Sequence, residues 1–220
     1  MMEEDYLDKI LNDLNFGEKY LSFFANRLTR SSVAFSTDID ITKQGILLDR
    51  TLSAINYIFK EDYEILRPNI ICEVAKLVDP NINAKGFRRV AAMVGDIKIS
   101  DPRQIYPHIY SLLDNYYNLW SDLDPYLRES YFHINFIHIH PFEDGNHRTA
   151  RILTANNLYR NGETPFVILS AYKKEYKQFI KNEDYDGLAD LFRKLAEIED
   201  GLIKMRYDQY TKDNKNYRNK

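Results

Sequence analysis

The chain has 220 residues, of which 44% are hydrophobic and 29% are charged, and its formal net charge is −3 at pH 7. This composition is ordinary for a globular protein with one sizeable core, and the slightly acidic balance argues against a dedicated nucleic-acid-binding protein. Because Cys72 is the single cysteine and no run of about 18 apolar residues occurs, we expect a soluble cytoplasmic protein without an intrachain disulfide or a membrane span.

Amphipathic spacing predicts helices along most of the chain. Apolar residues recur at helical intervals over about 3–14, 17–30, 42–58, 68–79, 102–113, 125–139 and 146–159. Thr42 is the expected N-cap of the third of these helices, and Asn161-Gly162 is a helix-end signal. Two or three further helices are expected over 171–205, and the last part, 206–220, is expected to be a polar tail that frays towards its end.

A short β-hairpin is expected at residues 90–100. β-Branched residues flank Gly95 and Asp96 there, and this dipeptide suits a two-residue hairpin turn with Gly at the first central position. The chain shows no internal repeat and no linker rich in Ser, Gly or Pro. The sequence therefore predicts a single compact all-α domain over 1–220, a helical bundle with one small β-hairpin.

The segment from His140 to Arg151 combines residue types that suit a nucleoside triphosphate; it reads HPFEDGNHRTAR. Gly145 and Asn146 can form a tight turn whose N–H groups point outward at the start of a helix, which is a favourable anion site. Arg148 and Arg151, three residues apart, lie on one face of that helix and can both reach phosphate oxygens. The start of this helix is therefore a candidate phosphate-binding site.

Two residues of the same segment can supply chemistry. Asp144 offers an oxygen ligand for Mg²⁺, which usually takes one or two protein carboxylates and completes its shell with phosphates and water. His140 is the natural general base for a hydroxyl nucleophile, because the unperturbed pKa of histidine lies near neutral pH. The residues themselves thus predict phosphate chemistry at this segment.

The segment is similar to the signature of Fic-domain proteins, H-x-F-x-D/E-G-N-x-R-x-x-R. Every defined position is filled, by His140, Phe142, Asp144, Gly145, Asn146, Arg148 and Arg151. Residues 86–89 resemble the family's G-x-F/Y-R element, and 93–99 resemble the flap that aligns the backbone of the target. The resemblance implies a Fic-type helical bundle with a β-hairpin flap over the active site, in which 1–68 form N-terminal helices and 69–196 form the Fic core.

This resemblance implies a protein adenylyltransferase, which transfers AMP from Mg-ATP to a Ser, Thr or Tyr hydroxyl of a protein target, including its own chain, and releases pyrophosphate. His140 is then the catalytic base, and Asp144 holds the Mg²⁺. The residues expected to bind ATP are Asp144, Gly145, Asn146, His147, Arg148, Thr149, Ala150, Arg151, Val94, Gly95, Asp96, Ile97 and Tyr176.

Finer roles follow from the same resemblance. The Asn146 side chain is expected to bind α-phosphate oxygens, Arg148 the β-phosphate and Arg151 the γ-phosphate. Phe142 is expected to be a buried anchor of the loop, whereas Glu143 is expected to be solvated.

Two residues depart from the family pattern. His147 stands where adenylyltransferases usually have Gly and the related Doc kinases have Lys, and we expect an exposed helical side chain there. Lys173 stands where the family often has Arg in an R-x-x-Y segment, with Tyr176 retained near the expected adenine site.

Residues 31–42 resemble the family's inhibitory helix, S/T-x-x-x-E-G/N, whose Glu pairs with the second arginine of the signature. With Ser32 as its first residue, Ser36 takes the place of the Glu. We therefore expect Arg151 to be free for the γ-phosphate and the full-length protein to be active. The alternative is that 31–42 is only an interhelical loop.

Other functions stay open at this point. A Doc-like protein phosphotransferase would transfer the γ-phosphate, and a non-catalytic nucleotide-dependent regulatory protein would transfer nothing. A zinc hydrolase is disfavoured, because His138 and His140 on a helix project about 200° apart and cannot share a metal. A homo-oligomer is compatible with the sequence, and neither nucleic acid nor a membrane is an expected partner.

Overall fold

The helices expected from the sequence make up most of the computed structural model, which describes residues 14–35, 44–60, 62–93, 95, 97 and 99–218. The helices are α2 (Leu14–Phe35), α3 (Gln44–Lys60), α4 (Pro68–Val78), α5 (Ile105–Asp114), α6 (Pro125–Ile139), α7 (Asn146–Arg160), α8 (Lys173–Asn182) and α9 (Tyr185–Arg218). None of them, in the described ranges, has the length and apolarity needed to cross a membrane. The expected helix over 3–13 and the Thr42 cap lie outside the described residues.

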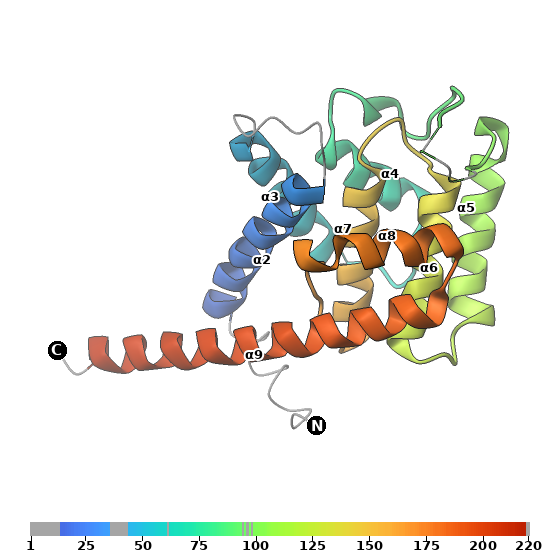
Figure 1. Cartoon of the computed structure of the whole chain (residues 1–220). Helices are drawn as coiled ribbons and strands as arrows, with labels where there is room; N and C mark the ends of the chain where they lie inside the picture. The colour runs from blue at the N-terminus through green and yellow to red at the C-terminus, as the bar shows by residue number, and fades with distance from the viewer. Residues whose placement is uncertain are drawn as a thin grey trace.

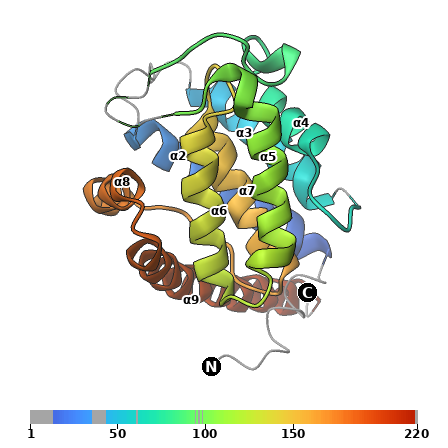
Figure 2. The ribbon, with the colours of Figure 1, turned by 90° about the vertical axis from the view of Figure 1, so that its right-hand side faces the viewer.

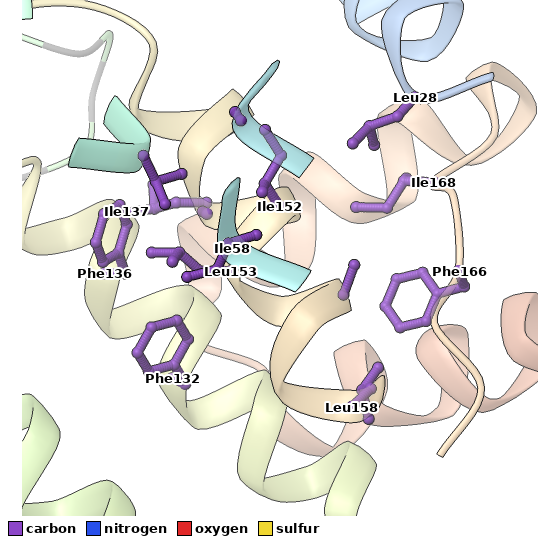
Figure 3. Packing of buried hydrophobic residues seen from close by; sticks show 14 of the residues in the cluster. Leu28, Ile58, Phe132, Phe136, Ile137, Ile152, Leu153, Leu158, Phe166 and Ile168 are labelled. Carbon is purple, nitrogen blue, oxygen red and sulfur yellow. The ribbon is translucent and has the colours of Figure 1, made fainter. Parts of the chain in front are cut away.

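Helix α7 forms the centre of the bundle (Figures 1 and 2). Every residue from Thr149 to Leu158 is buried, and the helix contacts α3, α4 and α6. A helix buried on all sides has to be enclosed by other elements, because no face of it can be left to water. Figure 3 shows how side chains of the surrounding helices fill this space, among them Leu28, Ile58, Phe132, Phe136 and Ile137, with Ile152, Leu153 and Leu158 from α7 itself.

Helix α6 starts and ends at residues that suit those positions. Asp124 is its N-cap, and the Asp124 carboxylate accepts from the N–H groups of Tyr126 and Leu127, both at 3.1 Å, while Pro125 occupies the first helical turn. The helix ends at His140, which adopts a left-handed conformation with φ 50° and ψ 61°. The chain therefore turns out of α6 at the first residue of the candidate active-site segment.

The polar tail expected at 206–220 is instead helical over residues 206–218, where it continues helix α9. The helix extends past the rest of the bundle alongside α2 (Figure 1). Aromatic contacts explain the extension: the ring of Phe16 in α2 lies 5.1 Å from that of Tyr207 and 5.5 Å from that of Tyr210. The Arg206 guanidinium also lies 3.2 Å from the centre of the Phe23 ring. These apolar contacts stabilise a stretch whose sequence is mostly polar.

The β-hairpin expected at 90–100 is not shown. Within the described residues no strand is present, and Ile97 makes only an isolated β-bridge. Gly95 has a positive φ of 52°, as the first central position of the expected turn requires. Val94 and Asp96, expected beside it in the ATP site, lie outside the described residues.

A buried ion pair joins α2 to α9 and can be tested. Glu199 of α9 is fully buried and accepts hydrogen bonds from Arg27 Nη1 and from the Tyr20 hydroxyl of α2. Burial raises the pKa of Glu199, and the Arg27 charge opposes that rise. We expect Arg27→Met to lower the free energy of unfolding by about 3 kcal/mol, because it leaves the carboxyl buried without its cation. Urea denaturation measures this change.

The control is the double variant Arg27→Met/Glu199→Met, which removes both charges and should recover most of the loss. A single variant as stable as the wild type would show that this pair does not hold α9 to α2.

Candidate active site

His140 stands at the junction between α6 and the loop 141–145. Its left-handed backbone, with φ 50°, costs a non-glycine residue about 1 kcal/mol, so the surroundings must hold it there. Two hydrogen bonds do so: the His140 N–H donates to the Phe136 carbonyl at 3.0 Å, and the His140 carbonyl accepts from Arg88 Nε at 2.7 Å. A strained residue held by specific bonds is a frequent property of functional sites.

The electrostatic surroundings keep the His140 imidazole neutral. The pKa of His140 is lowered to about 4, mainly by burial and then by the nearby Arg88 charge, while a main-chain hydrogen bond with Ile137 and the Asp144 charge oppose this shift. At neutral pH the ring is therefore unprotonated. It can accept a proton, as the general base expected from the sequence must.

The loop after His140 is anchored by Phe142 and Asn146. The Phe142 side chain is fully buried, and its ring lies 5.5 Å from that of Phe87, which confirms the expected anchor. Asn146 Oδ1 accepts from the Phe142 N–H at 2.9 Å, and Asn146 Nδ2 donates to the Phe142 carbonyl at 2.8 Å. Both ends of this amide hold the loop, and the expected contact of the Asn146 side chain with phosphate stays a prediction. Glu143 is exposed, as expected.

Gly145 allows the loop to turn into α7. It has φ 77° and is the N-cap of this helix, and no side chain caps the first turn. The first N–H groups of an α-helix have no partner within the helix, and together with the helix dipole they favour a bound anion. This geometry is what the expected phosphate site needs.

Arg148 and Asp144 pair with each other beside this helix start. Arg148 Nη2 lies 3.1 Å from Asp144 Oδ2 and 3.8 Å from Asp79 Oδ2. Asp144 Oδ1 also accepts from the Gly145 N–H at 2.5 Å. Both residues are placed where the sequence predicted, but the guanidinium is occupied by carboxylates, which a phosphate would have to replace.

The expected Mg²⁺ ligand can be tested against these contacts. Asp144 is exposed, and within the described ranges no three His, Cys, Asp or Glu side chains gather to hold a metal by themselves. A single accessible carboxylate suits Mg²⁺, which keeps water and substrate phosphates as most of its ligands. The donor set fits a magnesium ion that arrives with a nucleotide.

Three of the residues that were expected to bind ATP are buried. Thr149 and Ala150 are 0% exposed and pack inside the bundle, because they lie on the side of α7 that faces its neighbours. Tyr176 is also buried, and its hydroxyl lies 2.7 Å from His133 Nε2. In this conformation none of the three can touch a ligand. His133 itself is buried with Thr154 and Tyr176 as partners, which confirms a structural role for this histidine.

Arg151 is not free, contrary to expectation, because the last turn of α2 covers it. Arg151 Nη2 donates to the Ser32 hydroxyl at 2.9 Å, and its guanidinium lies 5.3 Å from the centre of the Phe35 ring. The Phe35 ring also makes an edge contact with Tyr176 at 5.5 Å, and Lys173 Nζ donates to the Ala34 carbonyl at 2.9 Å. Residues 31–35 form the last turn of α2 and pack on Arg151 and Tyr176, two of the residues expected to bind ATP.

Phe35 was missed as a site residue by reasoning from the sequence. A signal was present, because Phe35 follows Ser32 by three residues and must share its helix face. Ser36, the expected substitute for the inhibitory Glu, lies outside the described residues.

His147 is half-buried, which corrects the expected exposed side chain. Burial lowers the pKa of His147 to about 3, and the charges of Arg151 and Lys177 and the imidazole of His140 act in the same direction. His147 therefore adds a second neutral imidazole at the start of α7, next to the candidate phosphate site.

Comparisons with known proteins agree with this geometry. Residues 65–158 match the family model described as the Fic/DOC family. The protein named protein adenylyltransferase Fic in Drosophila persimilis is 29% identical over 174 residues, which cover 75% of this chain and 33% of that protein. This chain therefore spans about a third of the length of that curated relative.

Solved structures share the fold. Fic-1 from C. elegans superimposes with a TM-score of 0.69 at 17% identity, over 92% of this chain and 67% of that one. The crystal structure of an IbpAFic2 variant in complex with adenylylated Cdc42 has a TM-score of 0.62 at 17% identity, over 81% of this chain and 63% of that one.

The turn at Gly145 can be tested with a matched glycine. A Cβ at Gly145 would lie 3.0 Å from Val78 Cγ1, whereas a Cβ at Gly162, with nearly the same φ of 76°, would meet nothing within 4 Å. We expect Gly162→Ala to cost about 1 kcal/mol in the free energy of unfolding for its backbone conformation alone. Gly145→Ala should cost roughly 1 kcal/mol more, from crowding against α4. Equal losses in urea denaturation would mean that α4 yields to the added methyl group.

Proposed function

We propose that this chain, whose residues 65–158 match the Fic/DOC family model, is a protein adenylyltransferase. It transfers AMP from ATP to a Ser, Thr or Tyr hydroxyl of a protein. The observation that carries the proposal is the neutral His140 imidazole, which precedes the start of α7 with only the loop 141–145 between them. A neutral base followed along the chain by a phosphate-binding helix start suits the attack of a hydroxyl on phosphorus.

The proposed reaction breaks a phosphoanhydride bond of ATP and forms a phosphodiester bond between AMP and the target. His140 accepts the proton of the target hydroxyl, whose oxygen bonds to the α-phosphorus, while the bond to the β-phosphate oxygen breaks and pyrophosphate leaves. The N–H groups at the start of α7 bind the phosphoryl oxygens on which charge develops. The protein target is suggested by IbpAFic2, a neighbour in fold that was solved with adenylylated Cdc42.

Nucleotide binding rearranges the Arg148–Asp144 pair in this proposal. Arg148 exchanges its carboxylate partners for the β-phosphate, and Asp144 is then available to hold Mg²⁺. When bound, Mg²⁺ offsets the charge of the phosphates. The segment 90–100 is proposed as the flap that aligns the target.

Labelled ATP tests the proposal. We expect protein to become labelled from α-labelled ATP and not from γ-labelled ATP, with the enzyme itself among the modified proteins. His140→Ala should reduce transfer by about 10²–10⁴-fold and leave ATP binding nearly intact, because a general base makes no essential contact with phosphate. Arg148→Ala should weaken ATP binding and turnover together.

Label that enters protein only from the γ-phosphate would instead indicate a kinase-like phosphotransferase. Substantial transfer by His140→Ala would remove the base assignment.

We also propose that the end of α2 regulates the site. Ser32 and Phe35 occupy Arg151, and Lys173 holds the Ala34 carbonyl, so this turn has to withdraw before the γ-phosphate can reach Arg151. The contact lacks a carboxylate among the described residues. A hydroxyl and an aromatic ring hold a guanidinium less strongly than a carboxylate does, so we expect ATP to displace this contact.

Substitutions at two adjacent residues near this contact should have opposite effects on nucleotide binding and transfer. Phe35→Ala should tighten ATP binding about two- to thirtyfold, because a cation–π contact is worth about 0.5–2 kcal/mol. Ser36→Glu should suppress AMP transfer roughly ten- to a hundredfold by pairing with Arg151, and Arg151→Ala should abolish that sensitivity. Isothermal titration calorimetry and initial rates measure the two effects.

Ser22→Ala is the control, since Ser22 is an exposed residue of α2 whose hydroxyl donates to the Glu18 carbonyl within the same helix. Wild-type behaviour of both Phe35→Ala and Ser36→Glu would show that the end of α2 does not govern the site.

A further inference from the structure

Arg88 is a buried cation whose hydrogen bonds all go to the main chain. It is 2% exposed, and its guanidinium donates to three carbonyls: Nε to His140 at 2.7 Å, Nη1 to Val90 at 2.8 Å and Nη2 to Ser100 at 2.5 Å. Buried arginines usually face carboxylates or a ligand, because an uncompensated buried charge is costly. Here three carbonyl dipoles bond the guanidinium directly, and the charge of the Asp101 carboxylate also favours its charged form.

The three acceptor carbonyls belong to two parts of the chain, the segment 90–100 and His140. Val90 and Ser100 mark the two ends of segment 90–100, so a single guanidinium closes the base of this loop. The third acceptor is the carbonyl of the candidate base. The fixed fork of five N–H donors allows arginine to bond all three at once.

Main-chain hydrogen bonds reinforce the same junction. The Arg88 N–H donates to the Pro141 carbonyl at 2.8 Å, and the Ser100 N–H donates to the His138 carbonyl at 3.2 Å. Loop 90–100 is thus attached to the chain on both sides of His140, and the left-handed conformation of His140 has a direct source of support.

We propose that Arg88 is the positioning residue of this site: it holds His140 in its left-handed conformation and closes loop 90–100 onto it. Arg88 thereby fixes the position of the loop relative to His140. Arg88 acts through the main chain and contacts no reacting group. This role rests on the proposed function, in which the loop presents the target hydroxyl to His140.

Two substitutions separate the bonds of Arg88 from its charge. Arg88→Met removes both. Arg88→Lys keeps the charge, but one ammonium group cannot reach three separated carbonyls. Arg89→Met is the matched control, because Arg89 is the next residue and its side chain is exposed.

Kinetics supply the first readout. We expect Arg88→Met and Arg88→Lys to lower kcat for AMP transfer roughly ten- to a hundredfold, while KM for ATP changes less than about threefold, because orientation is lost and nucleotide contacts are not. Arg89→Met should match the wild type. A change confined to KM for ATP, or wild-type kcat in both Arg88 variants, would overturn the proposal.

Two further readouts do not depend on activity. Hydrogen exchange should accelerate at least about tenfold in peptides over 88–100 and 138–142 of both Arg88 variants, and not elsewhere. In an NMR titration the pKa of His140 should rise in Arg88→Met, where Asp144 and His147 remain as its titratable neighbours, and stay low in Arg88→Lys. Unchanged exchange in these peptides would show that Arg88 holds nothing in place.

The readouts also separate this proposal from the proposed function. If wild-type protein transfers no AMP, the adenylyltransferase assignment fails, yet exchange and the His140 titration still test Arg88. If Arg88→Met does not fold, Arg88→Lys carries the comparison through the same three measurements.

Discussion

The burial of α7 from Thr149 to Leu158 imposes the arrangement of the site. Because neighbouring helices enclose this helix, its motif arginines lie at different depths: Arg148 stays near the surface among carboxylates, whereas Arg151, one turn further on, is drawn inside. Within the described residues no carboxylate pairs with that buried cation. Its neighbours are a serine hydroxyl and an aromatic ring of α2, so the N-terminal helix packs where the charge needs partners.

The sequence was sufficient for much of this architecture, because its helices follow local rules. Helical spacing predicted α7 to within a residue, Asp124 and Pro125 begin α6, and the Asn161-Gly162 signal ends α7. The expected turn at Gly145 before α7 is also present, because a positive φ and a helix start depend on a few neighbouring residues. Features that depend on neighbouring residues could therefore be predicted from the sequence.

Contacts between distant segments were not predictable in the same way. The side chain of Asn146 had two plausible partners, phosphate and its own loop, and only the fold shows that the Phe142 main chain takes both of its hydrogen-bonding ends. The polarity of residues 206–218 predicted a frayed tail, because the ring contacts of Tyr207 and Tyr210 involve a helix about 190 residues earlier. The segment 86–89 resembles the family's element, but no spacing rule links Arg88 to His140.

The packing of α2 over Arg151 makes the protein its own competitor for nucleotide. In a population view, the apparent dissociation constant for ATP equals the intrinsic value divided by the fraction of molecules in which this turn is open. That fraction depends on everything that fastens α2, including its buried pair with Glu199 at a remote part of α9. Loosening the helix there would raise affinity at a site that the altered residue never touches, so stability and ligand affinity are traded against each other along one helix.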